Sequence, residues 1–140
     1  MVCVFFGHRD SSLSLKEKLD ALISELISEG IKDFFVGNNG NFDYLVQTIL
    51  ASRLKGGADI NVQIVLSFID EKALSQEQWL TVFPEELVFA PKRLRILKRN
   101  EYMLKKASVL VSYVKTKTSN AYKLLSKASK SGLRIINLTE

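Results

Sequence analysis

The sequence predicts a Rossmann-like α/β fold of three layers, in which helices cover both faces of a mainly parallel sheet of five to six strands. Short, β-branched apolar runs alternate with segments of helical periodicity along the chain. The apolar runs are nearly continuous, which is typical of strands that are buried on both faces of a parallel sheet. A length of 140 residues with 46% apolar residues and only two prolines predicts a single domain over 1–140.

The first half of the chain is expected to contain three strands and two helices. The first helix is predicted to begin with a capping box from Ser14 to Glu17, and Gly30 stands where its C-terminal cap belongs. Asn41 is expected to cap the second helix, which is followed by two glycines. The three strands are expected at 2–6, 33–36 and 60–68.

The second half of the chain begins with its least regular segment, 69–91, which is expected to hold a short helix and irregular chain. Within it, Leu87, Val88 and Phe89 form either a short strand or an extended connection. A helix is then expected from about Pro91 to Ala107, and Ser119 is expected to cap the last helix. The remaining strands are expected at 108–114 and 134–138.

Composition and charge restrict the classes of function. A net charge of +5 favours anionic partners such as nucleotides, nucleic acid or an acidic surface, and equally fits an ordinary soluble surface. The single cysteine, Cys3, and the single histidine, His8, are too few for the common zinc sites, so no metal and no required cofactor are expected. The sequence shows no signal-peptide pattern and no apolar run near about 18 residues, so we expect a cytoplasmic protein with no membrane partner.

The first candidate site is Gly7-His8-Arg9, which follows the first apolar strand. In parallel sheets, ligands bind outside the carboxyl ends of the strands, where the strand order reverses. Arg9 carries a forked set of donors suited to phosphate or carboxylate, and His8 could donate to an anion or transfer a proton. The alternative is structural: His8 caps the strand end, and Arg9 pairs with Asp10 or Asp43.

The second candidate site is the turn Gly37-Asn38-Asn39-Gly40, which joins a strand to the start of a helix. Its two glycines allow a close approach to the backbone, and a helix N-terminus offers free N–H groups to an anion. Asp43 lies in the first turn of that helix. Its carboxylate either meets ribose hydroxyls or simply complements the helix dipole.

The third candidate is the helix expected over 91–107, where Asn100 falls inside the apolar stripe. A buried amide needs hydrogen-bond partners, so Asn100 either bonds its neighbours or faces the ligand crevice. The opposite side of this helix is strongly basic and is either an ordinary solvated face or a surface for nucleic acid or a partner protein. Its expected members are Lys92, Arg93, Arg95, Lys98, Arg99, Lys105 and Lys106.

The fourth candidate is the polar segment that contains Thr116, Thr118 and Ser119, between a strand and the last helix. Its hydroxyl and N–H groups could hold a phosphate. They could equally be ordinary turn and capping residues.

Three of these blocks together resemble the SLOG superfamily (the Smf/DprA and LOG proteins), and most closely its small YpsA-like members. The blocks are 6–9, 37–43 and 99–103, in matching order and spacing. The resemblance implies a Rossmann-like protein that binds nucleotides or nucleotide-derived ligands, forms homo-oligomers and has a sensing or regulatory role. It implies a pocket lined by Gly7, His8, Arg9, Gly37, Gly40, Asp43 and Asn100.

The segment 114–121 departs from that family. LOG-type enzymes cleave nucleoside monophosphates at the N-glycosidic bond and carry a glycine-rich motif followed by a catalytic Glu, and neither is present here. The expected function is therefore a binding protein with no assigned catalytic residue. One alternative is an N-glycosidic hydrolase or transferase with His8 or Asp43 as the acid–base group. Another is a DNA-binding or protein-binding module that uses the basic helix 92–106.

Overall fold

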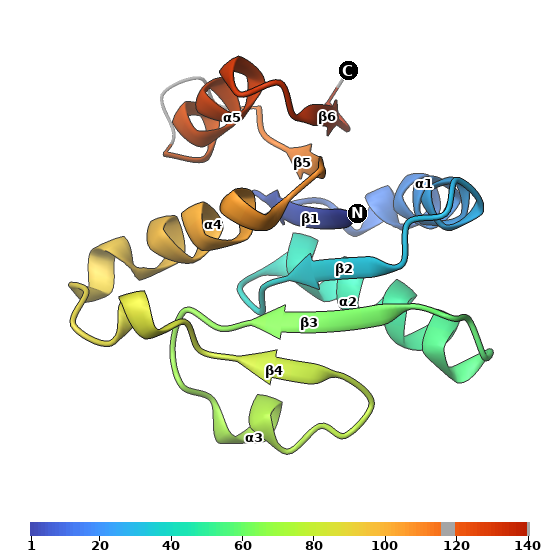
Figure 1. The fold of residues 1–140 in the computed structure, drawn as a ribbon, viewed down its shortest axis with the longest axis horizontal. Coiled ribbons are helices and arrows are strands. Elements are labelled where there is room, and N and C mark those ends of the chain that lie inside the picture. Colours follow the sequence, from blue (N-terminus) through green and yellow to red (C-terminus); the bar gives the residue numbers. More distant parts are fainter. Residues whose placement is uncertain (116–119, 140) are drawn as a thin grey trace.

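The structure is a computed structural model that describes residues 1–115 and 120–139 (Figure 1). Six strands form one parallel sheet in the order β4-β3-β2-β1-β5-β6. The Rossmann-like α/β fold predicted from the sequence is confirmed. The strands are β1 (Val2–Gly7), β2 (Asp33–Val36), β3 (Asn61–Val65), β4 (Leu80–Val82), β5 (Val109–Tyr113) and β6 (Arg134–Asn137).

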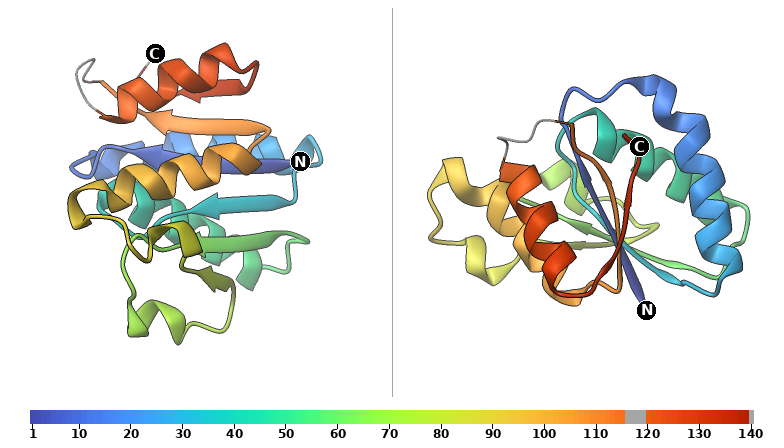
Figure 2. Two further views of the ribbon diagram at one scale, coloured as in Figure 1. Left: turned by 60° about the vertical axis from the view of Figure 1, so that its left-hand side comes forward. Right: turned by 90° about the horizontal axis from the view of Figure 1, so that it is seen from above.

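Helices cover both faces of the sheet and complete the three layers. Seen from above in Figure 2, right, α1 and α2 lie on one face, and α4 and α5 lie on the other. Among the described residues, no helix has both the length and the apolar character needed to cross a membrane. The helices are α1 (Lys16–Ser28), α2 (Asn41–Lys55), α3 (Glu71–Leu74), α4 (Arg95–Lys106) and α5 (Asn120–Lys130).

The strand order reverses between β1 and β5. After β1 the chain moves outward through β2, β3 and β4, and α4 then returns it to β5 on the other side of β1. At this junction Phe6 pairs with Ser112, and Gly7 pairs with Tyr113. The carboxyl ends of β1 and β5 therefore flank the position where ligands bind in open parallel sheets.

The core has two parts, because the side chains of β1 alternate between the two faces of the sheet. Cys3 and Phe5 belong to the apolar cluster under α1 and α2. Val4 and Phe6 belong to the cluster under α4 and α5. All four side chains are buried, and the central strand thus holds the two helical layers on one rigid sheet.

The reactivity of Cys3 reports on this core. Burial in β1 raises the pKa of its thiol well above the ordinary value. We expect a thiol-specific reagent to modify the folded chain about a thousandfold or more slowly than the denatured chain, because modification requires global opening. Stopped-flow labelling measures the modification rates of the folded and the denatured chain, and all of the signal comes from Cys3 because it is the single cysteine. Equal rates would show that β1 is not buried.

Both predicted N-terminal helix caps in the first half of the chain are wrong, whereas Gly30 ends α1 in a left-handed conformation as expected. The cap before the first helical turn is Ser12, whose Oγ accepts the Ser14 N–H at 3.2 Å, and a 3₁₀ turn then leads directly into α1. The residue before α2 is Gly40, and Asn41 is already helical. The side chain of Asn41 donates to a carbonyl of the loop after β1 instead, so tertiary contacts have replaced the local capping geometry.

The irregular segment 69–91 also differs from the prediction. It contains the expected short helix, α3, and also the short edge strand β4, which was not assigned from the sequence. The suggested strand at 87–89 is wrong, because Leu87 ends a 3₁₀ turn and Phe89 is 97% exposed. The helix expected from Pro91 begins with a separate 3₁₀ turn, Lys92–Leu94, before α4.

Candidate binding site

A pocket of about 310 Å³ opens beside the carboxyl end of β1, next to the reversal of the strand order. Three segments form it: the end of β1 with the following loop, the turn before α2, and the N-terminal half of α4 with the 3₁₀ turn that precedes it. This is the region that Gly7-His8-Arg9 predicted. The lining residues are Gly7, His8, Arg9, Asn39, Arg93, Ile96, Leu97, Arg99 and Asn100.

Arg99 is a buried arginine in the wall of this pocket. It is 2% exposed, so its predicted place on the solvated face of the helix is wrong. Its Nε and Nη2 donate to the Asn100 side-chain oxygen at 3.2 and 2.7 Å, and its Nη1 donates to the Asn39 side-chain oxygen at 2.8 Å. Every nitrogen of the guanidinium therefore has a partner, as a buried cation requires.

Asp43 is the charge partner of Arg99. Its Oδ2 lies 3.4 Å from Nη1 of Arg99 and accepts the Asn39 N–H at 2.9 Å. Burial raises the pKa of the Asp43 carboxyl, and the Arg99 charge and the Asn39 N–H oppose that shift. Burial likewise lowers the pKa of Arg99. Asp43 is not among the residues that line the pocket, and its cation is Arg99, so the predicted alternative in which Arg9 pairs with Asp43 is wrong.

Asn39 links three elements at this site. Its side-chain oxygen accepts from Arg99 and from the Ser67 hydroxyl, the latter at 2.6 Å from just beyond β3. Its backbone N–H is directed to Asp43. Asn38 turns the other way and lies near Asp70, with 3.5 Å between the amide nitrogen and the carboxylate. Of the two asparagines in this turn, only Asn39 lines the pocket.

The two glycines of the turn make room for side chains of the protein and not for a ligand. A Cβ at Gly37 would collide with the Arg99 guanidinium and would lie 2.8 Å from Asp43 Oδ2. The sequence predicted that a ligand would approach the backbone at Gly37. In the structure the Arg99 guanidinium occupies that space. Gly40 has φ +89°, a left-handed conformation that favours glycine, and its Cα packs against Arg9. Neither glycine belongs to the pocket lining.

Backbone N–H groups of this turn were predicted to bind an anion, but the Asp43 carboxylate and a carbonyl of the protein already accept from two of them. The Asn39 N–H is directed to Asp43, and the Asn41 N–H donates to the Arg9 carbonyl at 2.8 Å. Two of the backbone donors near the start of α2 are therefore occupied. An anionic ligand would depend more on side-chain cations than on a backbone cradle.

His8 joins the loops that follow β1 and β5. Its backbone N–H donates to the Tyr113 carbonyl at 3.1 Å, and its ring Nε2 accepts the Lys115 backbone N–H at 2.7 Å. The edge of the Tyr113 ring meets the imidazole at 6.2 Å between centroids. These contacts agree with the structural alternative for His8, which bridges two strand ends, although its ring also lines the pocket.

Arg9 and Arg93 supply exposed positive charge at the pocket. Across the described ranges 1–115 and 120–139, neither guanidinium has an ion pair with an acidic residue, Asp10 included. Ile96 and Leu97 provide an apolar wall on α4 beside them. The site thus combines cations with an apolar surface, an arrangement that suits an anion attached to an organic group.

Sequence reasoning missed four participants in the site: Ser67, Arg93, Ile96 and Leu97. It also placed Arg99 on the wrong side of its helix. Asn100 could have indicated the correct side for Arg99. A polar pair at 99–100 interrupts the apolar stripe, and such an interruption indicates a buried hydrogen-bond network. The predicted residues Thr116, Thr118 and Ser119 lie outside the described part of the chain.

A scan against protein-family models finds no match to this chain, and a search of curated proteins also finds no match.

Proposed function

We propose that the pocket binds a nucleotide or a nucleotide-derived ligand, and that the protein serves a sensing or regulatory role. The observation that carries this proposal is the pair of exposed guanidinium groups beside an apolar wall, at the point where the strand order reverses. The likeness of its three sequence blocks to SLOG proteins points to the same ligand class.

Each group in the pocket then has a distinct task. Arg9 and Arg93 contact the phosphate, because forked guanidinium donors match phosphate oxygens. Ile96 and Leu97 contact the apolar part of the ligand, and the Asn100 amide nitrogen remains to orient it, since the Asn100 oxygen is taken by Arg99. Arg99 has its donors directed to protein acceptors, among them the Asp43 carboxylate, so it supports the wall and leaves the phosphate contacts to Arg9 and Arg93.

The contacts favour binding over N-glycosidic chemistry. That reaction needs an acid–base group, and the two candidates are His8 and Asp43. Asp43 is 2% exposed and is directed to Arg99 and Asn39. The Nε2 of His8 already accepts a backbone N–H. Asp43 is therefore a positioning residue, which holds Arg99 and Asn39 in the wall of the pocket.

Thermal unfolding in the presence of AMP, ADP, nucleotide sugars and dinucleotides tests this proposal. A ligand at about 100 times its Kd should stabilise the wild type by about 2.7 kcal/mol. We expect Arg9→Ala and Arg93→Ala to lose most of this shift because they lack the phosphate contacts. Lys98→Ala is the matched control, since Lys98 is an exposed cation of α4 outside the pocket lining.

The nucleoside provides the chemical control. Adenosine lacks the phosphate and should stabilise the wild type far less than AMP does. Equal shifts with adenosine and AMP, or equal loss in Lys98→Ala and Arg9→Ala, would contradict a phosphate site at Arg9 and Arg93. A folded wild type that responds to no compound of the panel would contradict nucleotide binding itself.

A further inference from the structure

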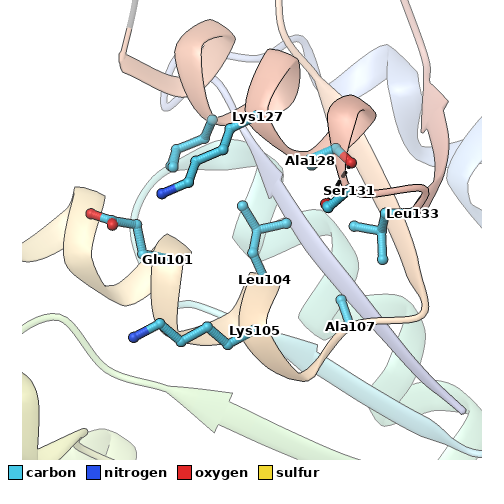
Figure 3. Close-up of a pocket in the computed structure, with 9 residues that line it drawn as sticks. Glu101, Leu104, Lys105, Ala107, Lys127, Ala128, Ser131 and Leu133 are labelled. Atoms are coloured by element: carbon cyan, nitrogen blue, oxygen red, sulfur yellow. Dashed lines mark hydrogen bonds between the residues drawn. The ribbon is translucent and has the colours of Figure 1, made fainter.

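A second groove, of about 380 Å³, lies between α4 and α5 and extends to the turn before β6 (Figure 3). It involves the C-terminal half of α4 from Glu101 onward, Ala107 just after that helix, and residues within 124–133. It shares no lining residue with the pocket at the end of β1.

The floor of this groove is apolar. Leu124 and Ala128 of α5 are buried, and Leu104 and Ala107 at the end of α4 are half-buried. Leu133 closes the groove at the turn before β6. A volume of this size suits a small organic molecule, whose apolar part would remove these side chains from water.

Three charged side chains gather at the opposite end of the groove. Figure 3 shows Glu101 and Lys105 of α4 and Lys127 of α5 on one side, and Leu133 and Ala107 on the other. Within the part of the chain that the structure describes, none of the three forms an ion pair. The groove therefore has an apolar end and a charged end with a net positive charge.

The surrounding surface strengthens that positive character. Between residues 90 and 139, Glu101 is the only acidic residue, and the exposed Lys106, Lys123 and Lys130 lie on the same two helices. A surface with one sign of charge attracts small anions and raises their local concentration.

We propose that the α4–α5 groove binds a small apolar carboxylate. Its carboxylate lies between the ammonium groups of Lys105 and Lys127, and its hydrocarbon part lies on Leu104 and Leu124. Glu101 is close to the same end and repels the bound carboxylate, so it limits the affinity. This site is independent of the proposed nucleotide pocket.

Calorimetric titration with octanoate, octanol and octylamine, kept below micelle-forming concentrations, tests the groove because these probes differ only in the head group. We expect octanoate to bind more tightly than the other two. Lys105→Met and Lys127→Met should each weaken octanoate binding by about tenfold, as expected for loss of a hydrogen bond to a charged group. Glu101→Gln should strengthen it. Lys130→Met is the control and should weaken it far less than Lys127→Met does, because Lys130 is outside the groove lining.

Several outcomes would overturn the proposal. These are no measurable octanoate binding, equal binding of octanol, and equal weakening by Lys130→Met and Lys127→Met. Weaker octanoate binding in Glu101→Gln would also overturn it, because a carboxylate ligand must gain from removal of the negative charge. All of the substituted side chains except Glu101 are exposed, and circular dichroism of each variant confirms that it is folded.

Discussion

Replacing Arg99 with methionine should destabilise the protein by about 3–5 kcal/mol, the range seen when one partner of a buried ion pair is removed. The variant keeps most of the apolar volume but leaves the Asp43 carboxylate buried without its cation. It also removes the donors to Asn39 and Asn100. Chemical denaturation of the wild type and the variant measures the difference in unfolding free energy.

The double variant shows whether this effect arises from the pair. Asp43→Asn combined with Arg99→Met removes both charges, so its loss of stability should be smaller than the sum of the two single losses by about 0.5–3 kcal/mol. Lys98→Met on the exposed face of α4 is the control and should change stability by less than about 0.5 kcal/mol. Additive losses, or an Arg99→Met variant as stable as the wild type, would show that the buried pair is not formed.

Replacing Gly37 with alanine should destabilise the protein by about 1–3 kcal/mol or more, the cost of forcing extra atoms into a packed site. The new Cβ would overlap the Arg99 guanidinium and approach Asp43 Oδ2 to 2.8 Å. Arg99 is held by Asn39 and Asn100 and cannot move without breaking hydrogen bonds. We expect a lower midpoint in chemical denaturation and weaker nucleotide binding, because the pocket wall shifts with Arg99.

Gly56 offers a matched glycine for comparison. It ends α2 with φ −78°, and a Cβ there would lie 3.5 Å from its nearest neighbour, an ordinary contact. Gly56→Ala should therefore keep nearly the stability of the wild type and its binding. Equal effects of the two substitutions would show that the loss at Gly37 comes from glycine replacement in general and not from Arg99.

The sheet and its two helical layers could be predicted because they depend on apolar patterns that are local in the sequence. Continuous apolar runs such as Val2 to Phe6 indicate strands that are buried on both faces. Apolar residues of α2 such as Leu45, Val46 and Ile49 recur at helical spacing, and all three are buried. The edge strand β4 was missed because it has three residues, and its first residue, Leu80, is exposed.

The details of the helix ends depend on contacts that a local pattern does not contain. Ser14 and Glu17 have the spacing of a capping box, yet the chain forms a 3₁₀ turn there that Ser12 caps. Asn41 is a favourable capping residue, but its side chain donates to the Ser11 carbonyl, 30 positions away in the sequence. Such tertiary hydrogen bonds override local preference.

The position of the candidate site followed from the sequence, whereas the roles of its residues did not. Gly7-His8-Arg9 lies at the reversal of the strand order, as expected for a ligand site. The pairing of Asp43 in α2 with Arg99 in α4 joins two residues that are 56 positions apart, and no local spacing indicates it. This pairing explains why two predicted ligand contacts, Gly37 and Asp43, serve to hold the wall of the pocket.

An NMR titration of the wild-type protein with AMP, resolved at individual backbone amides, tests the proposed site most directly. We expect the largest shifts at the amides of His8, Arg9, Asn39 and Asn100, in the pocket between β1 and α4, and only small shifts along α5. Shifts that centre on the α4–α5 groove, or the absence of any saturable shift in a folded sample, would contradict nucleotide binding at the carboxyl end of β1.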